Sequence, residues 1–295
     1  SDLYMNIDLN IISYMKKYIL YTAVACAAFA FVSCQGTSDG KQTSENIDSE
    51  RKVVIKQERP YSGNFEQITI LGSTDVVYRQ DEHYSIVVEC DSIYAPLVVT
   101  SVESGTLTIN LKGEDQEDVK LFAESPEVTV YVTSPVMRIV SVCGSGSFKA
   151  EGPISANDFH TGVIGSGDMS FDSLMCKKFN YQSTGSGDAE FGYIKASSID
   201  LLSNGSGDLK VGGLMSDSTV TIGMTSSGDM EIESAKAENV NIVATSSGNG
   251  LFSFDCMNLD MAASGSGHHI LEGRSKHGSV RSYGSAKVEN NLERK

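Results

Sequence analysis

One short turn recurs through the second half of the chain at nearly constant spacing. Its commonest form is Gly-Ser-Gly-Asp, and its copies begin at Gly144, Gly165, Gly185, Gly205, Ser226, Ser246 and Gly265, with a degenerate last copy at Gly284. The steps between these starting positions are 21, 20, 20, 21, 20, 19 and 19 residues. A fixed period of this length is typical of repeat proteins, in which each repeat packs only on its neighbours.

The residues between the turns alternate in polarity, as in strands that bury one face. An apolar residue follows each turn, at Phe171, Phe191, Val211, Ile232, Phe252 and Leu271. A second alternating run comes later in each repeat, as in Phe179 and Tyr181 or Ile199 and Leu201. Two or three short strands in about 20 residues fit one coil of a parallel β-helix. The Leu-x-x-Leu-x-Leu signature of leucine-rich repeats is missing, and a propeller blade needs about twice this period.

The turn glycines are therefore interpreted as corners of successive coils. Glycine adopts positive φ at no steric cost, so each coil can turn tightly. The structural turn residues are Gly144, Gly146, Gly165, Gly167, Gly185, Gly187, Gly205, Gly207, Gly228, Gly248, Gly265 and Gly267. We place the regular Gly-Ser-Gly repeats at 141–287 and irregular first coils, or a strand-rich cap, at 61–140. Both belong to one β-helix domain, 61–295, whose charged tail from residue 287 is suited to cap the far end.

The N-terminal region is typical of an exported protein. Met15, Lys16 and Lys17 precede an apolar run of about 15 residues, which is shorter than a membrane-spanning helix needs. The run ends at Cys34, and the residues before it resemble the lipobox of bacterial lipoproteins, with Phe31 in place of the usual Leu. Residues 1–33 are thus predicted to be an upstream extension plus a lipoprotein signal peptide, and Cys34 the lipidated residue. The alternative is a cleaved signal with an incidental cysteine.

Residues 34–60 are predicted to be a flexible tether, because their polar composition offers little apolar surface to offset the entropy of ordering. No Asp follows Cys34, which in lipoproteins implies sorting to the outer membrane, facing either the periplasm or the cell surface.

Composition excludes some classes of function. The chain has 295 residues and a formal net charge of −15, with 40% hydrophobic residues. That apolar content can form a core. The negative charge argues against nucleic-acid binding, whose affinity comes from neutralising phosphates with basic residues.

The sequence resembles the auto-transporter adhesin head GIN domain family, whose members are common in the envelope of Bacteroidetes, often as lipoproteins. The resemblance is carried by the segment from Phe65 to Ile68, by the segments 72–76 and 105–110, and by the serial Gly-Ser-Gly-Asp turns, and it covers roughly 64–287. It implies an all-β fold, a right-handed single-stranded parallel β-helix, and the role of a cell-surface adhesin.

Four carboxylates share one phase of the repeat and are the candidate metal ligands. They are Asp168, Asp188, Asp208 and Asp229, and the column continues with Asn249 and His268. One hypothesis is a Ca²⁺ ladder, because side chains stacked about 4.8 Å apart would repel one another unless hydrated or bridged by cations. The other, which we favour, is that each Asp accepts hydrogen bonds from its own turn. The neutral members of the column favour the second, so no metal or cofactor is predicted.

Histidines and cysteines provide two weaker candidates. His268, His269 and His277 are interpreted as surface residues of the last coil, because adjacent strand residues point to opposite faces and cannot easily bind one ion. Cys176 and Cys256 share a phase but lie four coils apart, about 19 Å, which is too far for a disulfide. They are expected to be buried thiols.

No catalytic residue is predicted. Enzymes on β-helices build a groove from long insertions, whereas the repeat length here stays between 19 and 21 residues. The expected function is therefore a non-catalytic envelope lipoprotein that binds a glycan or protein through an extended solenoid face, held to the membrane by its N-terminal lipid. The alternatives are a carbohydrate-active β-helix enzyme, either a polysaccharide lyase or a hydrolase, and an envelope spacer without a specific ligand.

Overall fold

The computed structural model describes residues 53–112, 127–225 and 227–295, and the residues from Val54 onward form one compact unit. All regular elements in these ranges are β-strands. None of the described segments is a helix with the length and apolar character to cross a membrane. The predicted signal peptide, the lipidation site Cys34 and the tether up to residue 52 lie outside the described residues.

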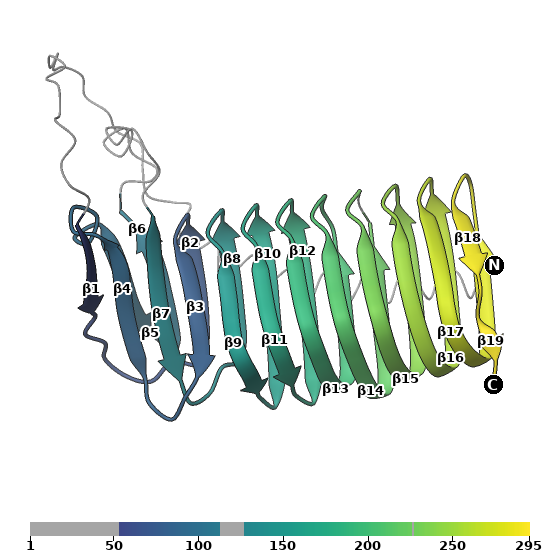
Figure 1. The fold of residues 1–295 in the computed structure, drawn as a ribbon, viewed down its shortest axis with the longest axis horizontal. Helices are drawn as coiled ribbons and strands as arrows, with labels where there is room; N and C mark the ends of the chain where they lie inside the picture. The colour runs from purple at the N-terminus through teal and green to yellow at the C-terminus, as the bar shows by residue number, and fades with distance from the viewer. Residues whose placement is uncertain (1–52, 113–126, 226) are drawn as a thin grey trace, which may run out of the picture. The chain divides into compact units, whose positions relative to one another are not determined.

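The regular repeats form a parallel β-solenoid of about eight turns, as the sequence predicts. Equivalent residues one repeat apart pair in register, so Gly165 lies beside Gly185 and Phe171 beside Phe191. Figure 1 shows the coils stacked side by side from teal to yellow. Their strands are β8 (Ile139–Gly144), β9 (Phe148–Ser155), β10 (Asp158–Gly165), β11 (Met169–Met175), β12 (Lys178–Gly185), β13 (Ala189–Ser203), β14 (Leu209–Met224), β15 (Met230–Ser246), β16 (Gly250–Gly265) and β17 (His268–Ser282).

The core consists of continuous rows of inward side chains, one residue per coil. The apolar positions predicted after each turn are buried and pair in series from Phe171 through Phe191 to Leu271. Phe191 stacks on Phe171 with ring centroids 5.1 Å apart and also meets the edges of Phe179 and Tyr181. Period-2 alternation therefore identifies the buried face correctly.

The turn glycines form two columns, and close backbone approach constrains them more than positive φ does. Gly165 has a φ of +131° and Gly265 one of +101°, as the corner interpretation expects. The positive-φ interpretation is wrong for the other turn glycines, which are Gly146, Gly167, Gly187, Gly205, Gly207, Gly228, Gly248 and Gly267. A Cβ added to Gly187 would lie 2.0 Å from the carbonyl oxygen of Gly167 in the preceding coil. The second glycine of each turn is thus required because the turns stack backbone on backbone.

The first strands differ from simple parallel coils. β2 (Gln67–Gly72) and β3 (Asp75–Gln80) pair in parallel with β8 and β9 on one side and with β6 and β7 on the other. Three antiparallel pairings lie beyond them: β5 with β6, β4 with β7, and β1 with β4. The strands are β1 (Val54–Glu58), β4 (Ser85–Asp91), β5 (Val98–Glu103), β6 (Thr106–Leu111) and β7 (Val128–Ser134). The region predicted as irregular first coils, or a strand-rich cap, is therefore a cap that mixes parallel and antiparallel pairings.

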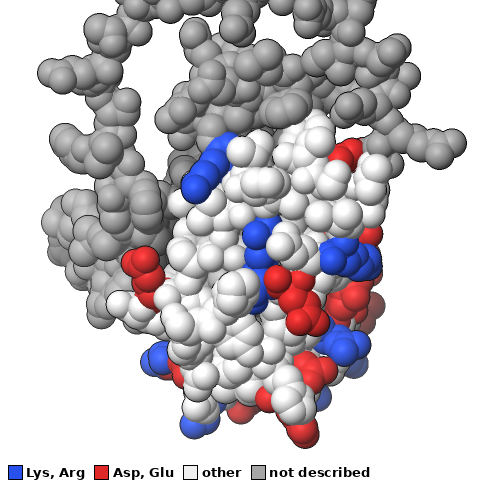
Figure 2. Space-filling view, turned by 90° about the vertical axis from the view of Figure 1, so that its left-hand side faces the viewer, with Lys and Arg blue, Asp and Glu red and all other residues white. Residues whose placement is uncertain are grey.

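Two local features explain this cap. Ser104 and Gly105, with φ of 49° and 80°, join β5 to β6 with the two positive φ angles that a tight hairpin turn needs. β1 lies inside the range predicted to be a flexible tether, so that prediction is wrong for 54–58. Ile55 packs on the core, and Lys56 forms an ion pair with Glu89 at 3.0 Å. Figure 2 views this end, where basic and acidic side chains are interleaved on the described surface.

The last coil is covered by two short strands, β18 (Lys287–Asn290) and β19 (Glu293–Arg294), which both pair with β17. Asp255 lies beside this edge and forms ion pairs with Arg274 and Lys295. Both cations lower the pKa of the Asp255 carboxyl through hydrogen bonds, Lys295 most strongly. The residues after 287 therefore cover part of the final coil, as their charged composition indicates.

Candidate functional site

The aspartates of the turns form a hydrogen-bonded ladder along the solenoid. The carboxylate of Asp168 accepts a hydrogen bond from the backbone N–H of Asp188 at 2.9 Å. Asp188 accepts in the same way from Asp208, and Asp208 from Asp229, each at 2.8 Å. Asp229 then accepts from the N–H of Asn249 at 2.6 Å. Each Asp side chain therefore links its own coil to the next one.

This geometry corrects the prediction that each Asp bonds its own turn. The acceptor belongs to one coil and the donor to the equivalent residue about 20 positions later, because register stacking brings equivalent atoms closer than the turn brings its own. Among the neutral members of the column, Asn249 fits the same role and Ser147 contributes its backbone N–H. Asn249 accepts from His268 N–H at 3.1 Å, and Ser147 N–H donates to Asp75 at 2.9 Å.

Within the described ranges, no three His, Cys, Asp or Glu side chains are grouped closely enough to hold a metal ion. The Ca²⁺ hypothesis at Asp168, Asp188, Asp208 and Asp229 remains a prediction that a titration must test, and the hydrogen bonds to backbone N–H groups give these carboxylates a role without a cation.

We expect Asp208→Ala to cost about 0.5–1.5 kcal/mol of unfolding free energy, because the N–H of Asp229 loses its acceptor at an exposed site. Asp208→Asn is the matched control, since an amide oxygen accepts the same bond and one charge leaves a column of like charges. Urea denaturation with and without millimolar Ca²⁺ measures both effects. If the wild type gains stability from Ca²⁺ and Asp208→Asn does not, the column is a cation site.

A groove of about 450 Å³ runs along the ladder over four coils. One side carries Asp168, Asp188 and Asp208. The other carries an outward row in which Lys149, Ser170, Glu190 and Lys210 pair in series. Backbone of the core row lies between the two sides, including Met169 and Ala189. This groove is not among the sites predicted from the sequence, although the polar or charged residue two positions beyond each Asp is a signal for it.

The basic residues of the groove already have carboxylate partners. Lys210 Nζ lies 2.8 Å from Glu233 and 3.6 Å from Glu231, and these partners raise the pKa of the exposed Lys210 ammonium. Lys149 Nζ lies 3.1 Å from Glu151. The groove is consequently polar and mixed in charge, and its surface offers hydrogen-bonding groups at regular intervals of one coil.

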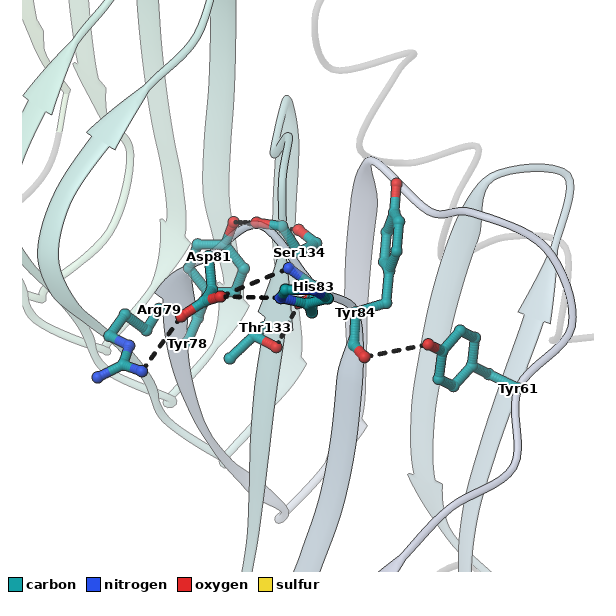
Figure 3. Close-up of polar contacts among 8 residues, drawn as sticks. All are labelled: Tyr61, Tyr78, Arg79, Asp81, His83, Tyr84, Thr133 and Ser134. Carbon is teal, nitrogen blue, oxygen red and sulfur yellow. Dashed lines mark hydrogen bonds and ion pairs between the residues drawn. The ribbon is translucent and has the colours of Figure 1, made fainter.

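A second polar cluster joins the cap to the solenoid and is structural (Figure 3). The Asp81 carboxylate contacts Arg79 at 3.2 Å and accepts from His83 N–H, and the hydrogen bond from His83 is the main cause that lowers the pKa of Asp81. Thr133 donates to the backbone carbonyl of His83 at 2.7 Å. These contacts fix the loop between β3 and β4 against the end of β7.

Aromatic residues, one buried and one exposed, support the same junction through their hydroxyl groups. The Tyr78 hydroxyl donates to the Ser134 carbonyl at 3.2 Å, and burial raises the pKa of Tyr78 to about 12. Tyr61 donates to the carbonyl of Tyr84 at 3.0 Å, and both rings pack near Phe65. Because these hydrogen bonds join residues of different strands and loops, the cluster holds the fold together.

The three histidines of the last coil do not come together. His268 points outward and lies 2.9 Å from Glu289, whereas His269 is fully buried. The prediction that all three are surface residues is therefore wrong for His269. Strand alternation turns its side chain inward, and Gly250, its register partner in the preceding coil, leaves space for the ring. Neither ring nitrogen of His269 has a hydrogen-bond partner among the described residues.

We expect His269 to make the last coil acid-sensitive. Burial lowers its pKa below the ordinary value, with His268 adding repulsion, so the unfolded chain binds a proton more readily than the folded chain. Stability is then fully present above the ordinary histidine pKa and is lost as pH falls through the lower folded value. His269→Leu should flatten the fall in unfolding free energy between pH 7 and pH 5, as measured by urea denaturation.

The matched control is His277→Asn, which changes an exposed histidine of the same coil. It should keep the acid sensitivity of the wild type. An unchanged pH profile in His269→Leu would show that His269 does not cause the sensitivity.

Cys90, Cys176 and Cys256 are free thiols. Cys256 is buried, as predicted, and Cys176 is half-buried, where burial raises its pKa to about 12. A thiol held protonated in this way is a poor nucleophile. These cysteines therefore act as small apolar residues.

Solved structures share this fold. A crystal structure of a putative adhesin from Parabacteroides distasonis aligns with a TM-score of 0.68 at 17% identity, covering 80% of this chain and 96% of that one. A putative lipid binding protein from the same organism gives 0.61 at 23%, with 80% and 96% covered. A putative adhesin from Bacteroides fragilis gives 0.60 at 18%, with 81% and 98% covered.

No curated protein matches the sequence. One sequence family does, and it is described as "Putative auto-transporter adhesin, head GIN domain". Its match extends over residues 64–237, which contain most of the cap and the first five copies of the turn. The resemblance drawn from the turns is therefore confirmed, and this chain belongs to the head GIN domain family of auto-transporter adhesins.

Proposed function

We propose that this protein is a non-catalytic binding module of a bacterial cell envelope, an adhesin that contacts an extended ligand along one face of its solenoid. The observation that carries the proposal is the groove beside the Asp ladder, which presents polar side chains at equivalent outward positions over four coils. A polymer can contact several coils at once, so individually weak contacts add up to useful avidity. The adhesin family supports the same role.

The shape of the coils favours binding over catalysis. Repeats of 19 to 21 residues leave no long insertion to enclose a substrate. A general acid in a glycosidase is a carboxyl placed in an apolar pocket, whereas Asp168, Asp188 and Asp208 are exposed. These features support the non-catalytic alternative over a polysaccharide lyase or hydrolase.

The test is binding of the purified full chain to immobilised glycans and extracellular matrix proteins, followed by analysis of each bound polymer for soluble products. We expect binding that grows with polymer length and leaves the polymer intact. Release of oligosaccharides from any polymer would establish an enzyme instead. Absence of binding to every immobilised ligand would contradict the binding role and favour a spacer.

We further propose that the chain is exported and lipidated at Cys34, which anchors it to the outer membrane. The apolar run before Cys34 and the missing Asp after it support this proposal. Expression of the full chain in a Gram-negative host, followed by detergent phase separation and mass spectrometry, should recover an acylated peptide beginning at Cys34. Cys34→Ser should abolish acylation, and an unmodified wild-type Cys34 would contradict the anchor.

A further inference from the structure

An exposed tyrosine lies at a bare corner of the solenoid, outside the groove. Tyr193 is 40% exposed, and the two core residues on either side of the corner, Phe191 and Ile194, point inward. Gly192 and Tyr193 therefore both face solvent at the bend between two walls of the coil. A large aromatic ring at such a position leaves apolar surface in contact with water and adds nothing to the core. It is therefore a candidate for ligand contact.

The neighbouring coils leave this ring uncovered. The register partners of Tyr193 are Ser173 in the preceding coil and Gly213 in the next. A Cβ on Gly213 would lie 2.8 Å from Cδ2 of Tyr193, so one ring edge lies against the glycine backbone. The hydroxyl reaches the Met215 sulfur at 3.8 Å. The ring is thus held over the surface of the next coil with small residues around it.

Within the described part of the chain, some charged side chains around the ring already have hydrogen-bond or ion-pair partners, and others do not. The carboxylate of Asp172 accepts a hydrogen bond from Gly152 N–H at 2.7 Å, and Glu233 pairs with Lys210 at 2.8 Å. Lys195 and Lys236 are exposed, and neither has an ion-pair partner among the described residues. Asp255, the register partner of Lys236 in the next coil, pairs with Arg274 and Lys295. These three carboxylates are therefore occupied, and the two lysines are available.

The two lysines share one outward row with two exposed methionines. Met175, Lys195, Met215 and Lys236 pair in series through four successive coils, so the lysines lie two coils apart, about 10 Å. Met175 and Met215 are 45% and 38% exposed. Lys195 lies two residues after Tyr193 in the same strand, so the row runs beside the corner. Along the row, apolar and positively charged side chains alternate from one coil to the next.

From this juxtaposition we infer that the Tyr193 corner (Tyr193, Gly213, Met215, Lys195 and Lys236) binds a polysaccharide that carries carboxylates, a polymer of uronic acids. This inference rests on the proposed binding function and adds to the groove a second contact site with a named ligand class. The flat apolar face of a sugar stacks on the Tyr193 ring, and a carboxylate of the chain meets each lysine. The net charge of −15 does not prevent this, because charges farther than about 8 Å are screened at physiological salt.

The test compares two probes of equal length, oligogalacturonate hexasaccharide and neutral galactohexaose, by calorimetry with the full chain. We expect the charged probe to bind at least tenfold more tightly, with an affinity that falls as salt rises. Tyr193→Ala should lower that affinity about tenfold, and Tyr193→Phe should keep it. The matched control is Tyr283→Ala, which removes an exposed tyrosine of the last coil and should bind as the wild type does.

Two further variants separate stacking from charge. Gly213→Ala retains the Tyr193 ring but displaces it, because the new Cβ would overlap the ring edge. The affinity for the charged probe should therefore fall several-fold, while thermal stability stays near that of the wild type. Lys195→Gln with Lys236→Gln should weaken binding of the charged probe and flatten its salt dependence, whereas Lys178→Gln on another wall should do neither.

The outcomes distinguish the inference from the general function. Binding of oligogalacturonate that is unaffected by Tyr193→Ala and Gly213→Ala would overturn this site while leaving the binding module intact. Preference for galactohexaose, for a protein or for anionic vesicles would overturn the ligand class. Failure of the wild-type chain to bind any glycan or protein would contradict both proposals.

Discussion

Gly187→Ala is expected to destabilise the solenoid by about 3 kcal/mol or more, because one added methyl group meets backbone that cannot move aside. The new Cβ would lie 2.0 Å from the carbonyl oxygen of Gly167 and 2.7 Å from its carbonyl carbon. Neighbouring coils must then separate locally, which weakens the adjacent ladder hydrogen bond between Asp168 and Asp188 as well. Chemical denaturation monitored by far-UV circular dichroism measures the loss.

The matched control is Gly278→Ala in the last coil. The nearest atom to a Cβ at Gly278 is 4.0 Å away, and its φ is not positive. Its effect should stay within about 0.5 kcal/mol, the usual range for surface substitutions. Equal effects of the two substitutions would show that strand propensity, and not backbone stacking, explains the glycine columns.

Phe191→Ala is expected to cost about 3–5 kcal/mol, the range for truncating a buried phenylalanine. Phe191 is fully buried and contacts the rings of Phe171, Phe179 and Tyr181, so its loss opens a cavity at the centre of an aromatic cluster. The cluster joins side chains from two walls of the coil, and the cavity cannot collapse without moving both.

Tyr193→Ala, two residues later in the same strand, provides the comparison for stability. Its ring is exposed, so the expected change in unfolding free energy is below about 1 kcal/mol. Thermal denaturation of both variants under identical conditions gives the difference. A larger loss from Tyr193→Ala than from Phe191→Ala would contradict the assignment of inward and outward faces.

The sequence predicts the coil well because the relevant signals are local and repeated. Alternation places Phe171 and Phe191 on the inner face, and a turn every 20 residues places them in neighbouring coils. The same period-2 alternation predicts that one of the two adjacent histidines is buried. The position of His269 in the last coil favours exposure instead, and the structure shows that alternation is the better guide. The space that Gly250 leaves for His269 becomes evident only when the two coils are in register.

The cap could not be derived in the same way, because pairing between distant strands has no local signature. β1 pairs with β4 some 30 residues away, although its short Val-Ile run lies in a polar segment. Ser104 and Gly105 are residue types typical of a hairpin turn, but they lie outside the regular repeats at 141–287. The target of each Asp carboxylate also depended on distances between coils, which composition and period do not contain.

The Tyr193 corner is the part of the candidate site that the sequence does not predict. Its exposure depends on Gly213 in the next coil and on a local break in the ladder at Gly192, where no register pair stands between those of Phe191 and Tyr193. Gly192 and Tyr193 both face outward at this break, which plain alternation does not predict. The neutral partners Ser173 and Gly213 are visible in the sequence only after the register is known.

Cross-linking of engineered cysteines tests the stacking of coils most directly. Ser166 and Ser186 are exposed and equivalent in adjacent coils, about 5 Å apart, whereas Ser206 lies two coils from Ser166, about 10 Å. Ser166→Cys with Ser186→Cys should form an intramolecular disulfide on mild oxidation, identified by mass spectrometry, and Ser166→Cys with Ser206→Cys should not, since bonding needs Cα atoms within about 7 Å. The reverse pattern, or no bond in the first pair, would contradict a solenoid with one coil per repeat.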